Sequence, residues 1–306
     1  MPKPDLTPPK EIERIEAPSR EVFEEEYVKR RRPVILTGVA TGMKAYREWT
    51  PDYLREIAGE SVVTAHYDEA GDFQQWYDMD DGVREDRQLP LGDLLDLLLA
   101  DPPDLRYYMT EHALHLISER LLEDVSMSDY ISDELVPGTS SGPCLFIGRD
   151  ISMPMHYHPT TEAFMCQLKG DKKVTLYGPD QCPNLYTTPW YKPTYIFSRV
   201  DYKTQRAMAQ HDRERMDFDA WPKLERAKGL EFTVKAGEVL FIPVHWWHVT
   251  SVDCFQLSVT YFWRSDPVRW HYPTPGLRVR ARETAKVMTE RWLKLKGLMT
   301  GKKAEA

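Results

Sequence analysis

Residues 255–262 read Phe-Gln-Leu-Ser-Val-Thr-Tyr-Phe, so apolar residues alternate with polar ones. Side chains two apart on a β-strand share a face, so this alternation predicts a strand with one buried face and one more polar face. Further short apolar runs, bounded by Gly, Pro or Asp, lie at 145–147, 163–168, 174–177 and 239–242. This pattern of short apolar runs is typical of an antiparallel sandwich or barrel, so we predict a mainly β fold class.

Helical patterns precede these strands. Residues 21–29 are charged and helix-prone, 33–38 form a short β-branched run, and 91–99 read as a buried helix. Thr50 before Pro51 is a natural N-cap, which predicts a helix from Pro51. We therefore expect N-terminal α/β additions to the β domain.

Three other segments complete the domain plan. Residues 1–20 are predicted to be a flexible N-terminal segment, and the domain itself spans 21–265. Residues 181–235 are rich in charge and aromatic side chains and interrupt the strands. They are predicted either as a substrate-contacting insertion or as a plain surface loop.

The end of the chain, 266–306, is predicted to be a C-terminal amphipathic helix followed by a basic tail. Its apolar residues recur at helical spacing: Leu277, Ala281, Ala285, Met288, Trp292 and Leu295. Such a stripe either docks on the sheet or pairs with its copy in a homodimer.

Composition excludes several function classes. The 306 residues carry a formal net charge of -8, which argues against general nucleic-acid binding, although the tail from Arg278 to Lys303 is basic. No run approaches the roughly 20 apolar residues that span a bilayer, and the N-terminus lacks the apolar core of a signal peptide. The four cysteines show no Cys-x-x-Cys spacing. We expect a cytoplasmic protein with no membrane association.

Four of the nine histidines fall in two short segments, 155–162 and 243–248. The segments read Met-His-Tyr-His-Pro-Thr-Thr-Glu and Pro-Val-His-Trp-Trp-His. On a strand, His156 and His158 share a face, about 6–7 Å apart at the backbone, close enough for one metal ion. His248 follows a strand that is a candidate neighbour in a barrel. We predict a metal site on these three histidines.

Imidazole nitrogens suit iron, zinc, copper and nickel, and three protein ligands leave positions open for substrate and dioxygen. Glu162, on the turn into the next strand, is a candidate fourth ligand, and His245 is predicted to line the mouth of the site. His-x-His alone is also found in partly exposed strand pairs. The second histidine segment favours a metal, and we expect Fe(II) and oxygenase chemistry.

The two segments resemble the cupin superfamily motifs His-x-His-x3-Glu-x6-Gly and Gly-x5-Pro-x-Gly-x2-His. Here they read His156-x-His158-x3-Glu162-x7-Gly170 and Gly237-x5-Pro243-x-His245-x2-His248. Over residues 20–265 the chain further resembles the Jumonji C, cupin-like hydroxylases, the group containing the asparaginyl hydroxylase that acts on hypoxia-inducible factor. Segments 32–38, 49–54, 107–112 and 170–177 carry that resemblance. It implies a double-stranded β-helix (jelly-roll barrel), Fe(II), 2-oxoglutarate, O2 and a peptide or small-molecule substrate.

The resemblance also assigns residues. It implies that His156 and His248 bind the metal, that Lys172 pairs with the distal carboxylate of 2-oxoglutarate, and that Tyr108 hydrogen-bonds the same group. A lysine on an inward strand face is costly unless it meets an anion. A solvent-exposed Lys172 in a charged turn is the alternative. The predicted substrate-pocket residues are His245, Trp246, Glu111 and Thr260.

The chain departs from the group at three positions. His158 stands where the group has Asp or Glu, Glu162 stands where the hydroxylases commonly carry Asn, and Met153 stands where Ser or Thr is frequent. A neutral ligand in place of an anionic one raises the charge on the metal and bears on the fit of 2-oxoglutarate.

Three functions therefore stay open. The first is a 2-oxoglutarate-dependent Fe(II) oxygenase that hydroxylates a peptide side chain or a small molecule. The second is a three-His cupin dioxygenase, with or without Glu162, that binds its substrate directly. The third is a non-catalytic cupin binding module, whose partner affinity would survive metal removal.

Overall fold

The protein is described by a computed structural model at residues 11–73, 86–100, 105–131, 142–192 and 194–266, and at 277, 281–282, 284–285, 287–289 and 291–292. Residues 1–10 of the predicted flexible segment lie outside these ranges. Within them, no helix combines the length and apolar character needed to cross a membrane.

The described chain contains eleven strands. They are β1 Glu13–Glu16, β2 Val34–Thr37, β3 Val62–Asp68, β4 Asp86–Pro90, β5 Arg106–Ala113, β6 Cys144–Tyr157, β7 Thr161–Lys169, β8 Lys172–Tyr177, β9 Gly229–Val234, β10 Val239–Ile242 and β11 Trp247–Arg264. The α-helices are α1 Arg20–Phe23, α2 Lys44–Glu48, α3 Pro51–Ala58, α4 Leu91–Leu99, α5 Leu114–Ile117, α6 Glu119–Glu123 and α7 Tyr202–Gln210. A π-turn, η1 Glu24–Val28, and the 3-10 turns η2 Ala40–Gly42, η5 Pro179–Asn184, η6 Arg213–Arg215 and η7 Pro222–Arg226 complete the elements.

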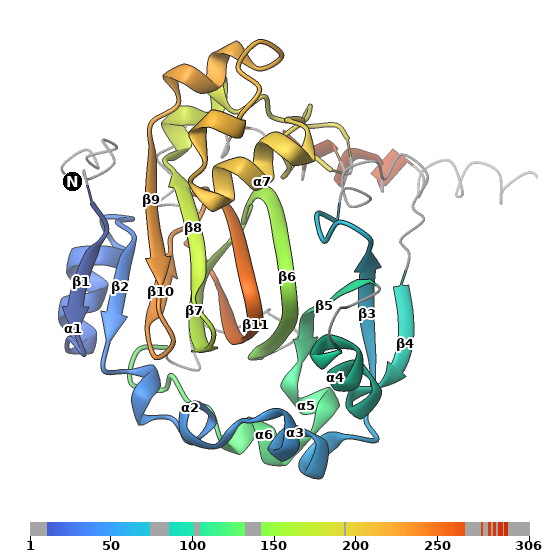
Figure 1. Ribbon diagram of the computed structural model, residues 1–306. Helices are drawn as coiled ribbons and strands as arrows, with labels where there is room; N and C mark the ends of the chain where they lie inside the picture. Colours follow the sequence, from blue (N-terminus) through green and yellow to red (C-terminus); the bar gives the residue numbers. More distant parts are fainter. Residues whose placement is uncertain are drawn as a thin grey trace, which may run out of the picture.

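The strands form one hydrogen-bonded sheet that folds back on itself (Figure 1). Its main path runs β1-β2-β10-β7-β11-β6-β5-β3-β4, and β8 and β9 branch from β11. β6 and β11 pair along most of their lengths, with a register shift between Val252 and Phe255. Before this shift β11 also pairs with β8, and after it with β7. The two long strands thus contribute to two layers, one that contains β8 and β9 and one that contains β7 and β10. This arrangement is the double-stranded β-helix that the resemblance implied.

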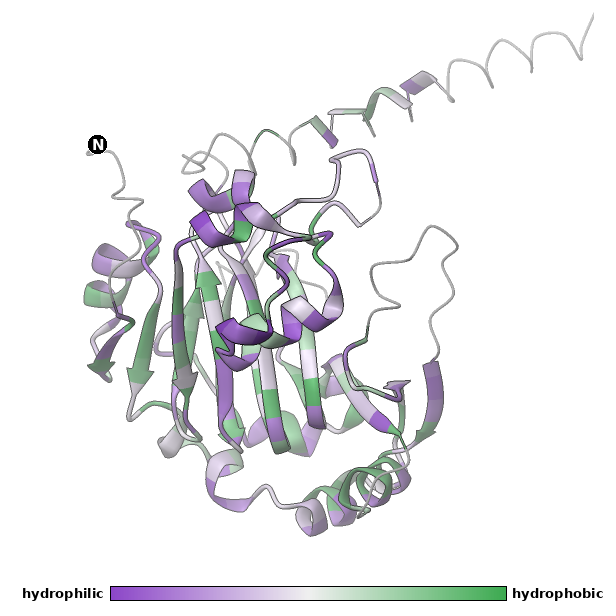
Figure 2. Ribbon diagram, turned by 45° about the horizontal axis from the view of Figure 1, so that its top comes forward, coloured by the Kyte–Doolittle hydropathy of each residue, from purple (hydrophilic) through white to green (hydrophobic). Residues whose placement is uncertain are grey.

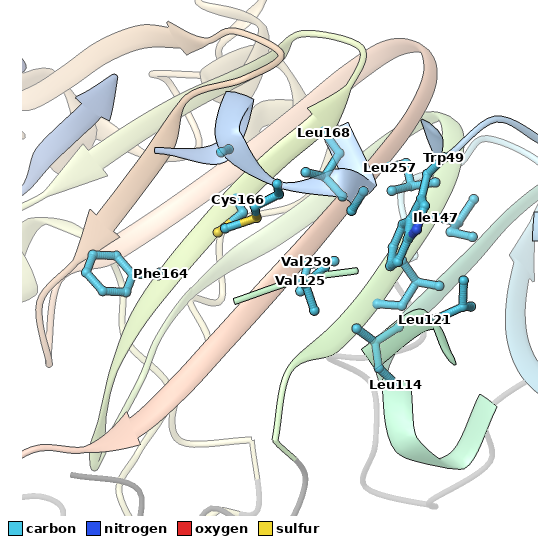
Figure 3. Close-up of a cluster of buried hydrophobic side chains, with 14 of the residues drawn as sticks. Trp49, Leu114, Leu121, Val125, Ile147, Phe164, Cys166, Leu168, Leu257 and Val259 are labelled. Carbon is cyan, nitrogen blue, oxygen red and sulfur yellow. The ribbon is translucent and has the colours of Figure 1, made fainter. Parts of the chain in front are cut away.

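Apolar clusters hold the layers together. One lies between them and joins β8 and β9 to β7 and β10 through Val174, Phe232, Met165 and Leu240. The larger one packs the outer face of β7 and β11 against the helices, as Figure 3 shows for Leu168 and Val259 near Trp49, Leu114 and Leu121. In Figure 2 the central strands are largely white and green, whereas α7 and the turns around it are mostly purple. The core thus lies along the strands.

Local signals in the first third are confirmed, with one correction. Thr50 caps α3 by accepting a hydrogen bond from the Tyr53 N–H, and Pro51 is the first helical residue. α4 covers Leu91–Leu99 as predicted. Residues 13–16, predicted to be flexible, instead form β1, which pairs in parallel with β2. Pairing with β2 stabilises this strand, because β2 supplies backbone hydrogen-bond partners that the isolated segment lacks.

The excursion 181–235 contributes a helix and a strand to the barrel. β9 pairs with β8 along its whole length, so the sheet resumes earlier than the sequence predicted. α7 packs against β8, β11 and β6 (Figure 1): Thr175 of β8 donates to the Met208 carbonyl at 2.8 Å and Ser251 of β11 to that of Ala209 at 3.2 Å. The structure therefore differs from a plain surface loop.

The described positions of the C-terminal segment are helical, as expected. Their apolar stripe is not docked on the sheet, because Leu277, Met288 and Trp292 are 63%, 66% and 58% exposed. Leu295 and the basic tail beyond it lie outside the described residues.

Both faces of the alternating run in β11 are buried. Leu257 and Val259 are 0% exposed, but so are Gln256 and Ser258, and Thr260 is only 6% exposed. The polar face looks into the barrel, where Ser258 meets Lys172 of β8. Alternation predicts two faces but does not say whether the second meets water, since sheet closure decides that.

A glycine in β6 tests how tightly the barrel wall is packed. A Cβ at Gly148 would lie 2.8 Å from Tyr108 Cδ2 and 3.2 Å from Ile151 Cγ1. We expect Gly148→Ala to lower the free energy of unfolding by about 1–3 kcal/mol through overpacking. Gly42→Ala, where a Cβ meets nothing within 4 Å, is the control and should change it by less than about 0.5 kcal/mol. Urea denaturation measures both, and equal effects would contradict the tight packing.

Candidate metal centre

Three histidine side chains converge at one end of the barrel. His156 of β6 lies opposite His248 of β11 in the antiparallel ladder, and His158 follows β6 directly. The ring centroids of His156 and His248 are 4.1 Å apart, and those of His158 and His248 are 4.8 Å apart. One nitrogen from each ring lies within 4.8 Å of the others. This spacing suits ligands of a single divalent ion.

Hydrogen bonds orient two of the rings. Nδ1 of His156 lies 2.7 Å from the Pro154 carbonyl oxygen, and Nδ1 of His248 lies 3.2 Å from that of Trp246. A carbonyl oxygen only accepts, so each Nδ1 carries the proton and each Nε2 keeps its lone pair. His158 Nδ1 is buried without a hydrogen-bond partner in the described part of the chain. The donor set therefore fits a metal ion.

Burial also keeps these rings neutral. Desolvation lowers the pKa of His156 to about 4 and that of His158 to about 3, where the neighbouring His156 adds to the effect. The pKa of His248 is lowered well below its usual value, by burial first and then by the two other histidines. Neutral imidazole is the metal-binding form, so the site needs no deprotonation at neutral pH.

Among the described residues, the candidate metal-binding cluster contains only these three histidines. Glu162 is buried, and its carboxylate accepts hydrogen bonds from the Val244 N–H at 2.6 Å and the Ser265 hydroxyl at 2.7 Å. These contacts tie the start of β7 to the turn that leads to His248. A role for Glu162 as fourth ligand stays a prediction.

Aromatic rings surround the histidines. Phe197 lies 5.6 Å from the His156 ring and Phe262 lies 5.2 Å from the His158 ring, centroid to centroid. Tyr157 packs on Trp247 at 4.6 Å. Such walls lower the local dielectric and strengthen any charge interaction at the site. Phe197 was not predicted, because no spacing rule connects a loop residue to the histidine beneath it.

Lys172 lies inside the barrel rather than in solvent. It is 3% exposed, and its ammonium donates to Ser258 Oγ at 3.2 Å and lies 3.7 Å from Met165 Sδ. Within the described ranges no carboxylate pairs with it. Burial lowers the pKa of Lys172 to about 7. An amine held this way is poised to receive an anion.

Tyr108 of β5 lies opposite Gly148 and is 2% exposed. Burial raises the pKa of its hydroxyl, and nearby Glu111 adds to the effect. The ring packs between Phe73 and Phe146, at centroid distances of 5.7 and 6.3 Å. The phenol thus stays protonated, as a hydrogen-bond donor must be.

The other predicted pocket residues, His245, Trp246, Thr260 and Glu111, lie in different environments. His245 is fully buried at φ 68°, and its Nε2 lies 3.1 Å from the Pro159 carbonyl oxygen. Trp246 donates to the Arg31 carbonyl at 3.1 Å and packs in the apolar cluster between the layers. Thr260 is buried on the inner face of β11, whereas Glu111 is exposed at a bulge of β5.

Comparison with known proteins agrees with this geometry. The sequence model of the Cupin-like domain matches residues 19–268. Lysine-specific demethylase 8 of Danio rerio is 28% identical over 271 residues, 85% of this chain and 60% of the relative. tRNA wybutosine-synthesizing protein 5 of Gallus gallus is 25% identical over 280 residues, 85% of this chain and 79% of the relative.

The human bifunctional peptidase and (3S)-lysyl hydroxylase JMJD7 is 25% identical over 260 residues, 78% of this chain and 80% of that protein. The chain spans 60% of the Danio rerio demethylase and 52% of its Xenopus tropicalis counterpart. The resemblance to the Jumonji C cupin group is confirmed.

Loss of one imidazole should weaken metal binding. We expect His248→Gln to lower the affinity for Co(II) or Zn(II) by about 100-fold or more, beyond the 10–100-fold typical of an outer contact. His115→Gln, at an exposed position on α5, is the control. Competition with a chromogenic chelator measures both, and equal affinities in the two variants would argue against the site.

Acid should destabilise the metal-free protein. The folded-state pKa values of the buried histidines lie below the unfolded value of about 6.5, so below that pH the unfolded chain binds protons that the folded chain does not. We expect the free energy of unfolding to fall as pH drops from 6.5 toward 4, by up to about 1.4 kcal/mol per pH unit for each such histidine. His245→Asn should reduce this slope by up to about 1.4 kcal/mol per pH unit, the contribution of one proton. Urea unfolding across this range gives the slope, and a flat profile would contradict the burial of neutral rings.

Proposed function

The chain belongs to the Cupin-like domain family, and from that premise we propose that it is an Fe(II)- and 2-oxoglutarate-dependent oxygenase. Its substrate is a small molecule or a peptide side chain, and O2 is the co-substrate. The named relatives include a demethylase and a lysyl hydroxylase, which supports oxygenase chemistry.

The observation that carries this proposal is Lys172. A lysine buried in a barrel without a carboxylate partner costs free energy unless a ligand supplies the anion. The three histidines occupy the same barrel, so a ligand that chelates the metal through a keto acid and carries a second carboxylate uses both features. 2-Oxoglutarate has that chemistry.

Each residue then has a role. His156, His158 and His248 would hold Fe(II), which supplies the chemistry that activates O2. Carbonyl contacts at Nδ1 keep two of these rings oriented with Nε2 free. Lys172 donates to the distal carboxylate, and binding of the anion favours its charged form. The Tyr108 hydroxyl is the second donor to that carboxylate.

His158 supports a second candidate function. Because it replaces a carboxylate ligand, the metal keeps its full charge and can bind an anionic organic substrate directly. The alternative is therefore a three-His cupin dioxygenase that needs no 2-oxoglutarate, with Glu162 as its candidate additional ligand. O2 uptake with substrate and without keto acid distinguishes it from the first function.

We expect 2-oxoglutarate to produce a weak visible charge-transfer band in the anaerobic Fe(II)-loaded protein. Lys172→Ala should weaken 2-oxoglutarate binding by about 10- to 100-fold, because it removes a charge-assisted hydrogen bond. Lys173→Ala is the matched control, since this neighbour is partly exposed and pairs with Asp253. Titration of the band in the three proteins measures the affinities.

No band in the Fe(II)-loaded parent would favour the keto-acid-independent dioxygenase. Partner binding that survives metal removal, without O2 uptake, would favour the non-catalytic binding module instead. A cytoplasmic location, and a homodimer formed through the C-terminal helix, stay predictions of the sequence.

A further inference from the structure

Four polar side chains form a chain inside the barrel, away from water. Lys172 of β8 is 3% exposed, and Ser258 and Gln256 of β11 and Gln167 of β7 are each 0% exposed. Polar groups buried this deeply are costly unless hydrogen-bonded to one another. Each hydrogen bond in this chain therefore has a defined donor and acceptor, and contacts with backbone carbonyl oxygens determine which is which.

Backbone carbonyls fix the first amide. Gln167 Nε2 donates to the carbonyl oxygens of Lys169 at 2.9 Å and Gly170 at 3.0 Å. Because these oxygens only accept, the nitrogen end of the amide must face them. The same Nε2 lies 3.5 Å from Gln256 Oε1.

The orientation of the second amide, that of Gln256, determines the donor in the contact between Ser258 and Lys172. Gln256 Nε2 donates to the Phe146 carbonyl at 3.3 Å, so Gln256 Oε1 faces Ser258. The Ser258 hydroxyl donates its single proton to that oxygen at 3.3 Å. Only lone pairs of Ser258 Oγ then remain to face Lys172, whose nitrogen lies 3.2 Å away. Lys172 must be the donor in this contact.

We propose that Ser258 and Gln256 are positioning residues that hold the Lys172 amine as a hydrogen-bond donor and thereby make the site prefer a keto acid with a second carboxylate. This inference rests on the proposed function, because it deepens the role given there to Lys172. Without the Ser258 hydroxyl, the amine's one remaining contact among the described residues is the thioether of Met165, 3.7 Å away, a weak acceptor. The amine then loses its fixed position, and its hydrogen bond to the distal carboxylate weakens.

The test compares two keto acids of equal chain length. 2-Oxoglutarate carries the second carboxylate and 2-oxopentanoate does not, so the ratio of their affinities reports on the groups that would hold that carboxylate, Lys172 and Tyr108. Calorimetry on the Zn(II)-loaded protein measures both without redox chemistry. We expect the parent to prefer 2-oxoglutarate, and Ser258→Ala to reduce that preference on the order of tenfold by weakening 2-oxoglutarate only.

Further variants separate positioning from damage to the fold. Ser258→Thr keeps the hydroxyl and should restore the preference. Lys172→Ala should remove most of it, leaving the contribution of Tyr108, and adding Ser258→Ala to that variant should change nothing more, because Lys172 and Ser258 act as one unit. Ser251→Ala is the matched control: this serine is also buried on β11 but donates to the Ala209 carbonyl. It should leave the ratio unchanged.

The outcomes distinguish the two proposals. If Lys172→Ala loses the preference and Ser258→Ala keeps it, the positioning role is wrong and the proposed function stands. If Ser258→Ala weakens both keto acids equally, the serine is structural and the positioning role is again wrong. If the parent does not prefer 2-oxoglutarate, both proposals fail.

Discussion

The antiparallel pairing of β6 with β11 is the constraint on which the rest of the structure depends. Their ladder sets His156 opposite His248, although the two histidines lie in separate segments of the sequence. The register shift between Val252 and Phe255 lets β11 pair first with β8 and then with β7. One strand therefore carries a histidine of the candidate metal site in one layer and the inward-facing serine in the other.

The charge inside the barrel depends on the histidines and the lysine that its strands bury. Three imidazoles that are neutral at physiological pH leave the charge of a divalent ion uncompensated, and Lys172 adds a group that is costly to bury alone. An acidic ligand at position 158 would offset part of that charge, but His158 does not. With a divalent ion on the histidines, electrostatics within this barrel would favour a dianionic ligand that spans from the histidines to the lysine over a neutral one.

The sequence predicted local elements well, but it did not predict how the sheet closes into a barrel. The Thr50 cap, the bounds of α4 and β10, and the two histidine segments follow from nearest neighbours and strand periodicity. β9 was assigned to the excursion because its six residues lie between charged turns, although 230, 232 and 234 alternate as a strand does. Ser258 was expected on the more polar face, and only the second layer reveals that this face is buried. Spacing also could not show that Glu162 would bond the Val244 N–H.

The excursion belongs to the site because it fixes the strands that carry the histidines. Gln205 of α7 accepts from the N–H of Met155, the residue before His156, and donates to the Val200 carbonyl. Arg206, the next residue, pairs with Asp72 and with Asp150 of β6, both at 2.9 Å. Buried hydrogen bonds and half-buried ion pairs of this kind hold a ligand strand in place before any metal arrives. Rigidity at His156 therefore comes from a segment whose sequence resembles a surface loop, since polar side chains that hold backbone in place look the same in sequence as those that meet water.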